Sequence, residues 1–412
     1  MSAARKRPAK GRPIEYSILY TATLCMLAAG AVMVYSASSA ESLLQGTGDA
    51  AFYLKRYVVF GLIGLVLMHY LSRHGLKAVK NVTPLLLVSS FVLCVAVMLP
   101  GVGVTVNGAT RWLGAGPLQF QPSELLKLSL ILYAAQLLAA RPRSTKTLGG
   151  LIKPLLLVVG AACGLLLQQP DMGTAMVVCF SIGALLIAAG VPIRHLAIIA
   201  GTLLAIGLIV ALAEPYRRAR ITSFMDPFSD ASGSGFQAVQ ALTAIGSGGF
   251  FGVGLGESVQ KIFYLPEAHT DMILAIIGEE IGLMGILGVA SLYGMVGYAG
   301  LRAAKAAGDL YSKLLAAGIT SLILCQATLN FFAVLGMAPL TGVPLPFISY
   351  GSTNLIVLLG GMGLLLNVAA SGGLRQGAKR PPLHAIEGGR TGQGGDRRGR
   401  DGGSRRAGAR GR

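Results

Sequence analysis

Apolar runs of roughly 20 residues recur along this chain and decide what it can fold into. A helical run of that length spans the hydrocarbon core of a bilayer, because a helix rises about 1.5 Å per residue. The short alternating segments that are typical of a membrane barrel do not occur in the sequence. Together with a mean hydropathy of +0.65, the runs predict an all-α polytopic membrane protein.

The runs predict ten transmembrane helices, with a large extracellular loop at 214–270 between the seventh and the eighth. The predicted spans lie near 14–36, 52–71, 82–100, 121–140, 151–168, 172–190, 192–213, 271–299, 312–336 and 350–370. A basic arm at 1–13 precedes the transmembrane domain at 14–372. The segment 373–412 is rich in arginine and glycine and is predicted to be a disordered basic tail.

Lysine and arginine gather in every second predicted loop and in both terminal segments. The positive-inside rule therefore places both termini in the cytoplasm and the loop 214–270 outside. A net charge of +18 is also compatible with a nucleic-acid partner. Much of that charge lies in the tail beside the membrane, however, where contact with anionic membrane lipids is the simpler interpretation. We therefore predict no nucleic-acid partner.

Titratable side chains cluster around the start of the predicted eighth span. Only 13% of the residues are charged, and a charged side chain that faces lipid costs several kcal/mol, so the cluster needs a reason. We interpret it as the reactive centre. Its members are Lys261, Glu267, His269, Asp271, Glu279 and Glu280.

Asp271 stands at the predicted beginning of that span and has two interpretations. As a helix cap, it or Thr270 would accept hydrogen bonds from the first free amide groups of the helix. As a general base, it would have its pKa tuned by its titratable neighbours Glu267 and His269. The local spacing alone does not decide between cap and base.

Glu279 and Glu280 lie deeper along the same predicted helix, inside the hydrocarbon region. The fourth predicted span carries Glu124 and, one turn later, Lys127. We interpret all four as buried structural charges that pair between helices, with Lys127 as the preferred partner of the two glutamates. The alternative is a direct role in proton transfer or substrate binding.

Three arginines, Arg217, Arg218 and Arg220, follow the seventh predicted span on the outer side, against the positive-inside bias. Guanidinium groups suit phosphate oxygens, so these residues indicate an anionic ligand, with anchoring to lipid headgroups as the alternative. A second long outer loop supplies Arg111 and Trp112, a cation beside the one tryptophan of the chain. An interfacial anchor is the alternative for this pair.

Six separated motifs resemble the SEDS family, the shape, elongation, division and sporulation proteins that polymerise peptidoglycan. In order they are NGATRWL (107–113), FQPSELLKL (120–128), QQPDMGTA (168–175), PYRRARITSFMDPFSDASGSGFQ (215–237), VGLGESVQKIFYLPEAHTDMILAIIGEE (253–280) and PLTGVPLPFISYGSTN (339–354). The similarity extends over nearly all of residues 14–372. The sequences PEAHTD and DPFSDASGSGFQ resemble the cell-division branch of the family more than the rod-elongation branch.

The resemblance implies a ten-helix fold and an inverting glycosyltransferase that polymerises lipid II at the outer face of the bacterial inner membrane, at the division septum. Asp271 would remove the proton from the 4-hydroxyl of the acceptor GlcNAc. That oxygen then attacks the anomeric carbon of a MurNAc whose leaving group is undecaprenyl diphosphate. The motifs also place Glu267, His269, Ser349 and Tyr350 in the substrate site.

A departing diphosphate is negatively charged, so the resemblance implies cations beside it. The candidates are Arg217, Arg218, Arg220 and Lys261. A divalent cation, Mg or Mn, could share this task, but the sequence contains no dedicated ligand set and no metal-binding residue is predicted.

The resemblance also implies partners and leaves rival functions open. The partners are a class B penicillin-binding protein, which would supply the transpeptidase, and other divisome proteins. One rival is a lipid II flippase or transporter, which would suit ten helices with glycine-rich breaks. Others are a rod-elongation polymerase of the same family and a scaffold whose charges only stabilise the fold.

Overall fold

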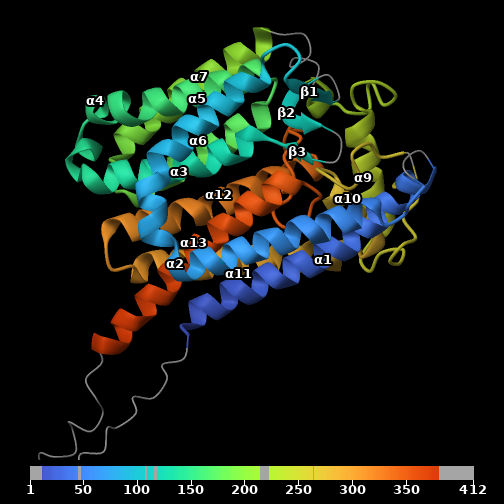
Figure 1. Ribbon diagram of the computed structural model, residues 1–412. Helices are drawn as coiled ribbons and strands as arrows, with labels where there is room; N and C mark the ends of the chain where they lie inside the picture. Colours follow the sequence, from blue (N-terminus) through green and yellow to red (C-terminus); the bar gives the residue numbers. More distant parts are fainter. Residues whose placement is uncertain are drawn as a thin grey trace, which may run out of the picture.

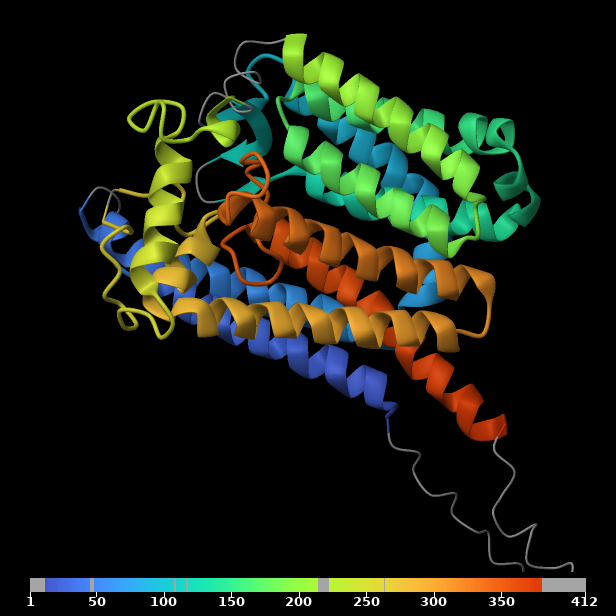
Figure 2. The same cartoon turned by 180° about the vertical axis from the view of Figure 1, so that it is seen from behind.

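The structure is a computed structural model, and it describes residues 12–44, 48–106, 109–115, 118–213, 222–262 and 264–379. Long helices form a bundle that carries a small sheet and a folded loop at one end (Figure 1). The described ends of the chain lie together at the opposite end, and the reverse view shows the same arrangement (Figure 2). Most of the predicted basic arm and tail lies outside the described residues.

Seven helices among the described residues are long and apolar enough to cross a membrane. They are α1 (Ile14–Leu44), α2 (Phe52–Val97), α3 (Pro122–Ala140), the run Leu148–Gln168, α11 (Gly282–Ala306), α12 (Leu310–Val334) and the segment Ser352–Gly372 of α13 (Ser352–Lys379). The run Leu148–Gln168 consists of α4 (Leu148–Leu151), the π-helical turn Ile152–Leu156 and α5 (Leu157–Gln168), and a 3₁₀ turn at Pro142–Lys146 precedes it. Shorter apolar helices are α6 (Met172–Ala188) and α7 (Ile193–Ala213). The polytopic helical fold is confirmed, and the count of ten spans stays a prediction.

The second and third predicted spans belong to one continuous helix of 46 residues, α2. Its ribbon turns sharply at the end of the bundle away from the sheet, so both halves run along the bundle (Figure 1). Arg73, Lys77 and Lys80, which we expected in a loop, are therefore helical. The physical reason is local: leucine, lysine and alanine around them favour helix, and the first proline comes only at Pro84.

A three-stranded antiparallel sheet connects α2 to α3, within the segment that we expected as a second long outer loop. Its strands are β1 (Gly103–Val106), β2 (Ala109–Ala115) and β3 (Leu118–Phe120), in that order. Trp112 on β2 lies opposite Val104 on β1. The physical reason lies in the residue types of this segment, because threonine, valine and tryptophan favour strands.

The predicted eighth span is broken into α10 (Ile273–Glu280) and α11. Gly282 at the break has a φ of +74°, and a Cβ atom there would lie 2.4 Å from the amide nitrogen of Gly252. That segment of the outer loop folds down onto α10, as the amide of Val253 donates to the carbonyl of Glu279 across 2.9 Å. The loop also contains α9 (Phe236–Gly248), which packs against α10.

The linker between α12 and α13 enters the bundle without regular structure, and Val343, Leu345 and Phe347 on it are buried. Side chains of neighbouring helices satisfy its carbonyl groups, as buried backbone in a membrane requires. Gln326 donates to Pro344 across 2.9 Å, and Tyr293 donates to Pro346 across 2.5 Å. These two bonds therefore tie the linker to α12 and α11.

Candidate active site

Asp271 lies half-buried in the turn that precedes α10. The helix begins at Ile273 and its N-cap position belongs to Met272, so neither Thr270 nor Asp271 stands at the N-cap position itself. The hydroxyl of Thr270 lies 2.7 Å from the carboxylate of Glu267 and 3.3 Å from that of Asp271. Two carboxylates and a hydroxyl therefore share one turn at the loop end of the bundle.

Two other elements fix the position of Asp271. The side-chain amide of Asn330 on α12 donates to the main-chain carbonyl of Asp271 across 2.7 Å and to that of Val343 across 2.8 Å. Gly342 on the linker faces the carboxylate, because a Cβ atom built there would lie 3.8 Å from Oδ2 of Asp271. Since Gly342 has a φ of +67°, only glycine adopts this conformation without strain. The carboxylate thus faces a bare α-carbon.

His269 is buried among side chains from α1, α2 and the linker. Its Nδ1 lies 3.4 Å from Oε2 of Glu41 on α1. Its ring centroid lies 4.3 Å from that of Tyr53 on α2 and 5.7 Å from that of Tyr350 on the linker. The amide of Tyr350 also donates to the carbonyl of His269 across 3.0 Å. The turn that carries Asp271 is therefore joined to α1, α2 and the linker through His269.

Arg56 brings a positive charge to the same cluster. Its guanidinium carbon lies 5.9 Å from the ring centroid of Tyr350 and 5.4 Å from that of Phe52. Glu41, Tyr53 and Arg56 were not among the site residues predicted from the sequence. A signal for Arg56 was present, because an arginine at the outer end of a span runs against the positive-inside bias.

Lys261 is buried in an ion pair with Glu280, with 2.9 Å between Nζ and Oε1. Its ammonium group also donates to the carbonyl of Gly256 across 2.6 Å and lies 3.2 Å from the hydroxyl of Ser36 on α1. The predicted pairing of Glu280 with Lys127 is therefore wrong. The positive charge of Lys261, which we assigned to a diphosphate, is matched by a carboxylate of the protein.

Glu279 also pairs locally rather than with Lys127. Its carboxylate accepts hydrogen bonds from the hydroxyl of Ser258 at 2.5 Å and from the amide of Val259 at 3.0 Å. The reason is the fold of the outer loop, which places 249–262 directly on α10. Both glutamates hold this loop on the helix.

Lys127 pairs with Glu124 within α3, across 2.9 Å, and both side chains are 2% exposed. The ammonium group of Lys127 also donates to Gln326 Oε1 across 2.9 Å. Because Gln326 holds the linker through Pro344, the pair is connected to the backbone beside the candidate site. The structure thus buries all four charges that we interpreted as structural.

Three predicted substrate-binding residues are engaged elsewhere. Nε of Arg111 donates to the carbonyl of Gln169 across 3.1 Å, and its guanidinium lies 3.8 Å from the carboxylate of Asp171. Arg111 and its neighbour Trp112 therefore belong to a strand that is attached to the turn between α5 and α6. Ser349 is buried, and its hydroxyl accepts a hydrogen bond from the amide of Leu345 at 2.8 Å.

The structure thus brings Glu267, His269 and Tyr350 together with Asp271. Arg217, Arg218 and Arg220 lie outside the described residues. Within the described ranges, no group of three or more histidine, cysteine, aspartate or glutamate side chains could hold a metal ion. The predicted divalent cation stays a prediction.

A family profile described as cell cycle protein, which covers FtsW, RodA and SpoVE, matches residues 16–372. The chain is 42% identical over 368 residues to the probable peptidoglycan glycosyltransferase FtsW of Thioalkalivibrio sulfidiphilus, which covers 87% of this chain and 91% of that protein. It is 39% identical over 354 residues to the stage V sporulation protein E of Bacillus subtilis. That match covers 85% of this chain and 96% of that protein.

Solved structures are similar over the same length. One comes from work on the structural coordination of polymerization and crosslinking by a peptidoglycan synthase complex. Its chain matches with a TM-score of 0.70 and 32% identity, over 85% of this chain and 96% of that one. The rod shape determining protein RodA of Thermus thermophilus matches with a TM-score of 0.60 and 29% identity, over 85% of this chain and 95% of that one.

Proposed function

Because this chain belongs to the cell cycle protein family of FtsW, RodA and SpoVE, we propose that it is a peptidoglycan glycosyltransferase that polymerises lipid II for cell division. One observation carries the proposal beyond the family. The carboxylate of Asp271 is held in a fixed turn at the loop end of a membrane bundle, and it faces the bare α-carbon of Gly342. Glycine at position 342 keeps a side chain away from this face of the carboxylate.

Asp271 acts as the general base. It removes the proton from the 4-hydroxyl of the acceptor GlcNAc while that oxygen forms a bond to the anomeric carbon of the donor MurNAc. The bond between that carbon and the undecaprenyl diphosphate breaks, and the diphosphate leaves with the electron pair, so the configuration inverts. A base contributes only when it is held within hydrogen-bond reach of the proton, and Asn330 and Thr270 supply that orientation.

The leaving diphosphate needs positive charge nearby. Since Glu280 matches the charge of Lys261, we assign this task to Arg56 and to the predicted cluster Arg217, Arg218 and Arg220. Guanidinium groups bind phosphate oxygens in a bidentate manner, which suits a diphosphate better than a single ammonium does. A divalent cation, Mg or Mn, remains a candidate to share this task.

The partners and the location follow from the same family membership. A class B penicillin-binding protein would supply the crosslinking step. A solved structure similar to this chain comes from a peptidoglycan synthase complex that coordinates polymerization and crosslinking. The chain is a multi-pass membrane protein. The proposal further includes cytoplasmic termini, a septal location and other divisome proteins. Both described ends lie at the end of the bundle away from α10, which agrees with that orientation (Figure 1).

The test is lipid II polymerisation by the purified full-length protein with its class B partner, comparing wild type with Asp271→Asn. Glu257→Gln is the matched control, because it neutralises an exposed carboxylate of the same loop. We expect glycan from wild type and Glu257→Gln and none from Asp271→Asn at equal folding and partner binding. Glycan from Asp271→Asn would remove the base from the mechanism. Lipid II translocation in vesicles without polymerisation would instead favour the flippase.

A further inference from the structure

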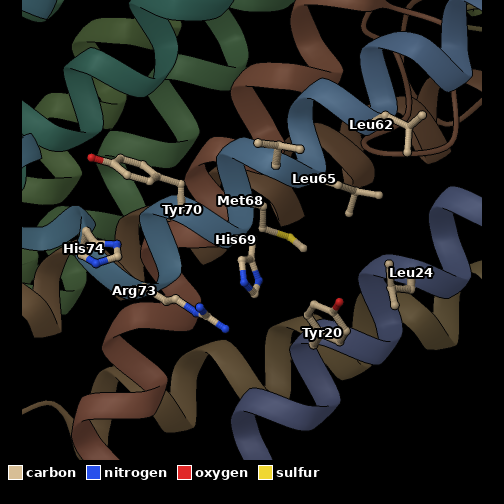
Figure 3. Close-up of a pocket in the computed structure, with 10 residues that line it drawn as sticks. Tyr20, Leu24, Leu62, Leu65, Met68, His69, Tyr70, Arg73 and His74 are labelled. Carbon is tan, nitrogen blue, oxygen red and sulfur yellow. The ribbon is translucent and has the colours of Figure 1, made fainter.

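A cavity of about 610 Å³ opens between α1 and α2 (Figure 3). Leu24 on α1 and Leu62 and Leu65 on α2 line one end of it. Tyr20 on α1 and Arg73 on α2 line the other end. The cavity is therefore amphipathic along its length, with an apolar end and a basic end.

The apolar end faces outward from the bundle, since the side chain of Leu62 is 57% exposed. In a membrane such a surface contacts the acyl chains of lipids. A chain of methylene groups can lie along these apolar side chains.

The basic end of the groove offers a cation, the guanidinium group of Arg73. Arg73 is exposed, and no carboxylate among the described residues pairs with it. By contrast, Arg302 at the same end of the bundle pairs with Glu15 across 3.1 Å. His69 lies one helical turn before Arg73, and both side chains point into the same space (Figure 3). A guanidinium group in this setting matches the phosphate of a lipid headgroup.

Arg73 also lies near one end of the bundle, where we expect lipid headgroups. It precedes the sharp turn of α2, next to Lys77 and Lys80, at the end of the bundle where both described chain ends lie. The positive-inside rule assigns this end to the cytoplasmic leaflet, whose anionic lipids attract basic residues. The apolar residues lie further along α2, where acyl chains run.

We propose that this groove binds one anionic phospholipid of that leaflet. Its phosphate contacts Arg73, and one acyl chain lies along Leu24, Leu62 and Leu65. The site is separate from the candidate active site and does not depend on the proposed activity. An anionic lipid bound there fastens α1 to the first half of α2, which are the two helices that supply Glu41 and Tyr53 to the candidate site.

The test is native mass spectrometry of the full-length protein, equilibrated with equal amounts of phosphatidylglycerol and phosphatidylcholine. We expect wild type to retain one phosphatidylglycerol in preference to phosphatidylcholine. Arg73→Gln should lower this preference about five-fold, which corresponds to about 1 kcal/mol for one basic residue at the membrane surface. Arg143→Gln is the matched control, an exposed arginine at the same end and outside the groove, and should behave as wild type.

A second variant tests the apolar end independently of charge. Leu62→Trp fills the groove and should lower the retention of both lipids while the melting temperature stays that of wild type. Equal retention of the two lipids by wild type would overturn the proposal. An equal loss in Arg73→Gln and Arg143→Gln would also overturn it, and so would a copurifying protein segment that occupies the groove in place of lipid.

Discussion

The side-chain amide of Asn330 on α12 donates to the main-chain carbonyl of Asp271 across 2.7 Å. The same amide donates to Val343 on the linker, so a single side chain fixes the turn of the candidate base against the segment that faces it. Misplacement of a catalytic group by about 1 Å can lower a rate by about a hundred-fold. The position of Asp271 is thus determined by a residue that was not among the sequence-predicted site residues.

Asn330→Ala should therefore lower the rate of lipid II polymerisation by about ten- to a hundred-fold while the fold is retained. Asn367→Ala is the matched control, because Asn367 on α13 also donates to two main-chain carbonyls, those of Leu71 and Ser72. Both variants should lose similar thermal stability, measured by melting in detergent. A rate in Asn330→Ala that is no lower than in Asn367→Ala would contradict the positioning role.

Glu41 and His269 form a second relationship that can be tested. Glu41→Ala should lower the polymerisation rate by about ten-fold, because the imidazole loses the carboxylate that lies 3.4 Å from its Nδ1, on the ring that contacts Tyr53. Glu41→Gln keeps an oxygen at that place and should retain most of the rate. Glu15→Ala removes a carboxylate from an ion pair at the far end of α1 and serves as the control. Equal losses in Glu41→Gln and Glu41→Ala would point to charge instead of orientation.

The buried pair of Lys261 and Glu280 leads to a prediction about stability. Lys261→Met leaves the Glu280 carboxylate buried without its counter-charge and should destabilise the protein by about 3 kcal/mol or more. Combining it with Glu280→Gln should recover most of that loss. Lys55→Met breaks the exposed pair with Asp49 and should change stability by less than about 1 kcal/mol. If Lys261→Met melts as wild type and loses only activity, then Lys261 serves the substrate after all.

A substitution at Gly342 can separate the effect of backbone strain on stability from the effect of an added side chain on polymerisation. Gly342→Ala places a methyl group 3.8 Å from the Asp271 carboxylate and strains a φ of +67°. Gly190→Ala meets a φ of +78° in open space and is the matched control. Both should lose about 1 kcal/mol of stability, since left-handed backbone disfavours alanine. Only Gly342→Ala should also lose polymerisation, and equal activity in the two variants would exclude a substrate beside Gly342.

The helical framework was predictable because bilayer thickness sets the length of each apolar run. The predicted spans at 121–140 and 312–336 agree with α3 and α12 within a few residues. The break at Gly282 was not predictable in the same way. It depends on the close approach of Gly252, which is 30 residues away in the sequence and is brought there by the fold of the loop.

In the candidate site, too, some residues were predictable from the sequence and others were not. Glu267, His269 and Asp271 were found because titratable residues are conspicuous in an apolar sequence. Tyr53 has no local signal, because the pattern of its helix reports only burial. Glu41 is charged, but its place in the sequence does not show that it lies beside His269. The partner of Lys261 was missed because pairs between a loop and a helix depend on tertiary packing, which sequence spacing does not encode.

Arg56 is the cation that the structure adds to the site, and its charge can be tested directly. Arg56→Gln should lower the polymerisation rate, because the departing diphosphate loses positive charge beside Tyr350. Arg56→Lys keeps the charge but not the planar fork and should recover only part of the rate. Lys55→Gln removes the neighbouring exposed charge and should behave as wild type. If Arg56→Gln is as fast as Lys55→Gln, then Arg56 does not stabilise the departing diphosphate, and Arg217, Arg218 and Arg220 are the candidates for that task.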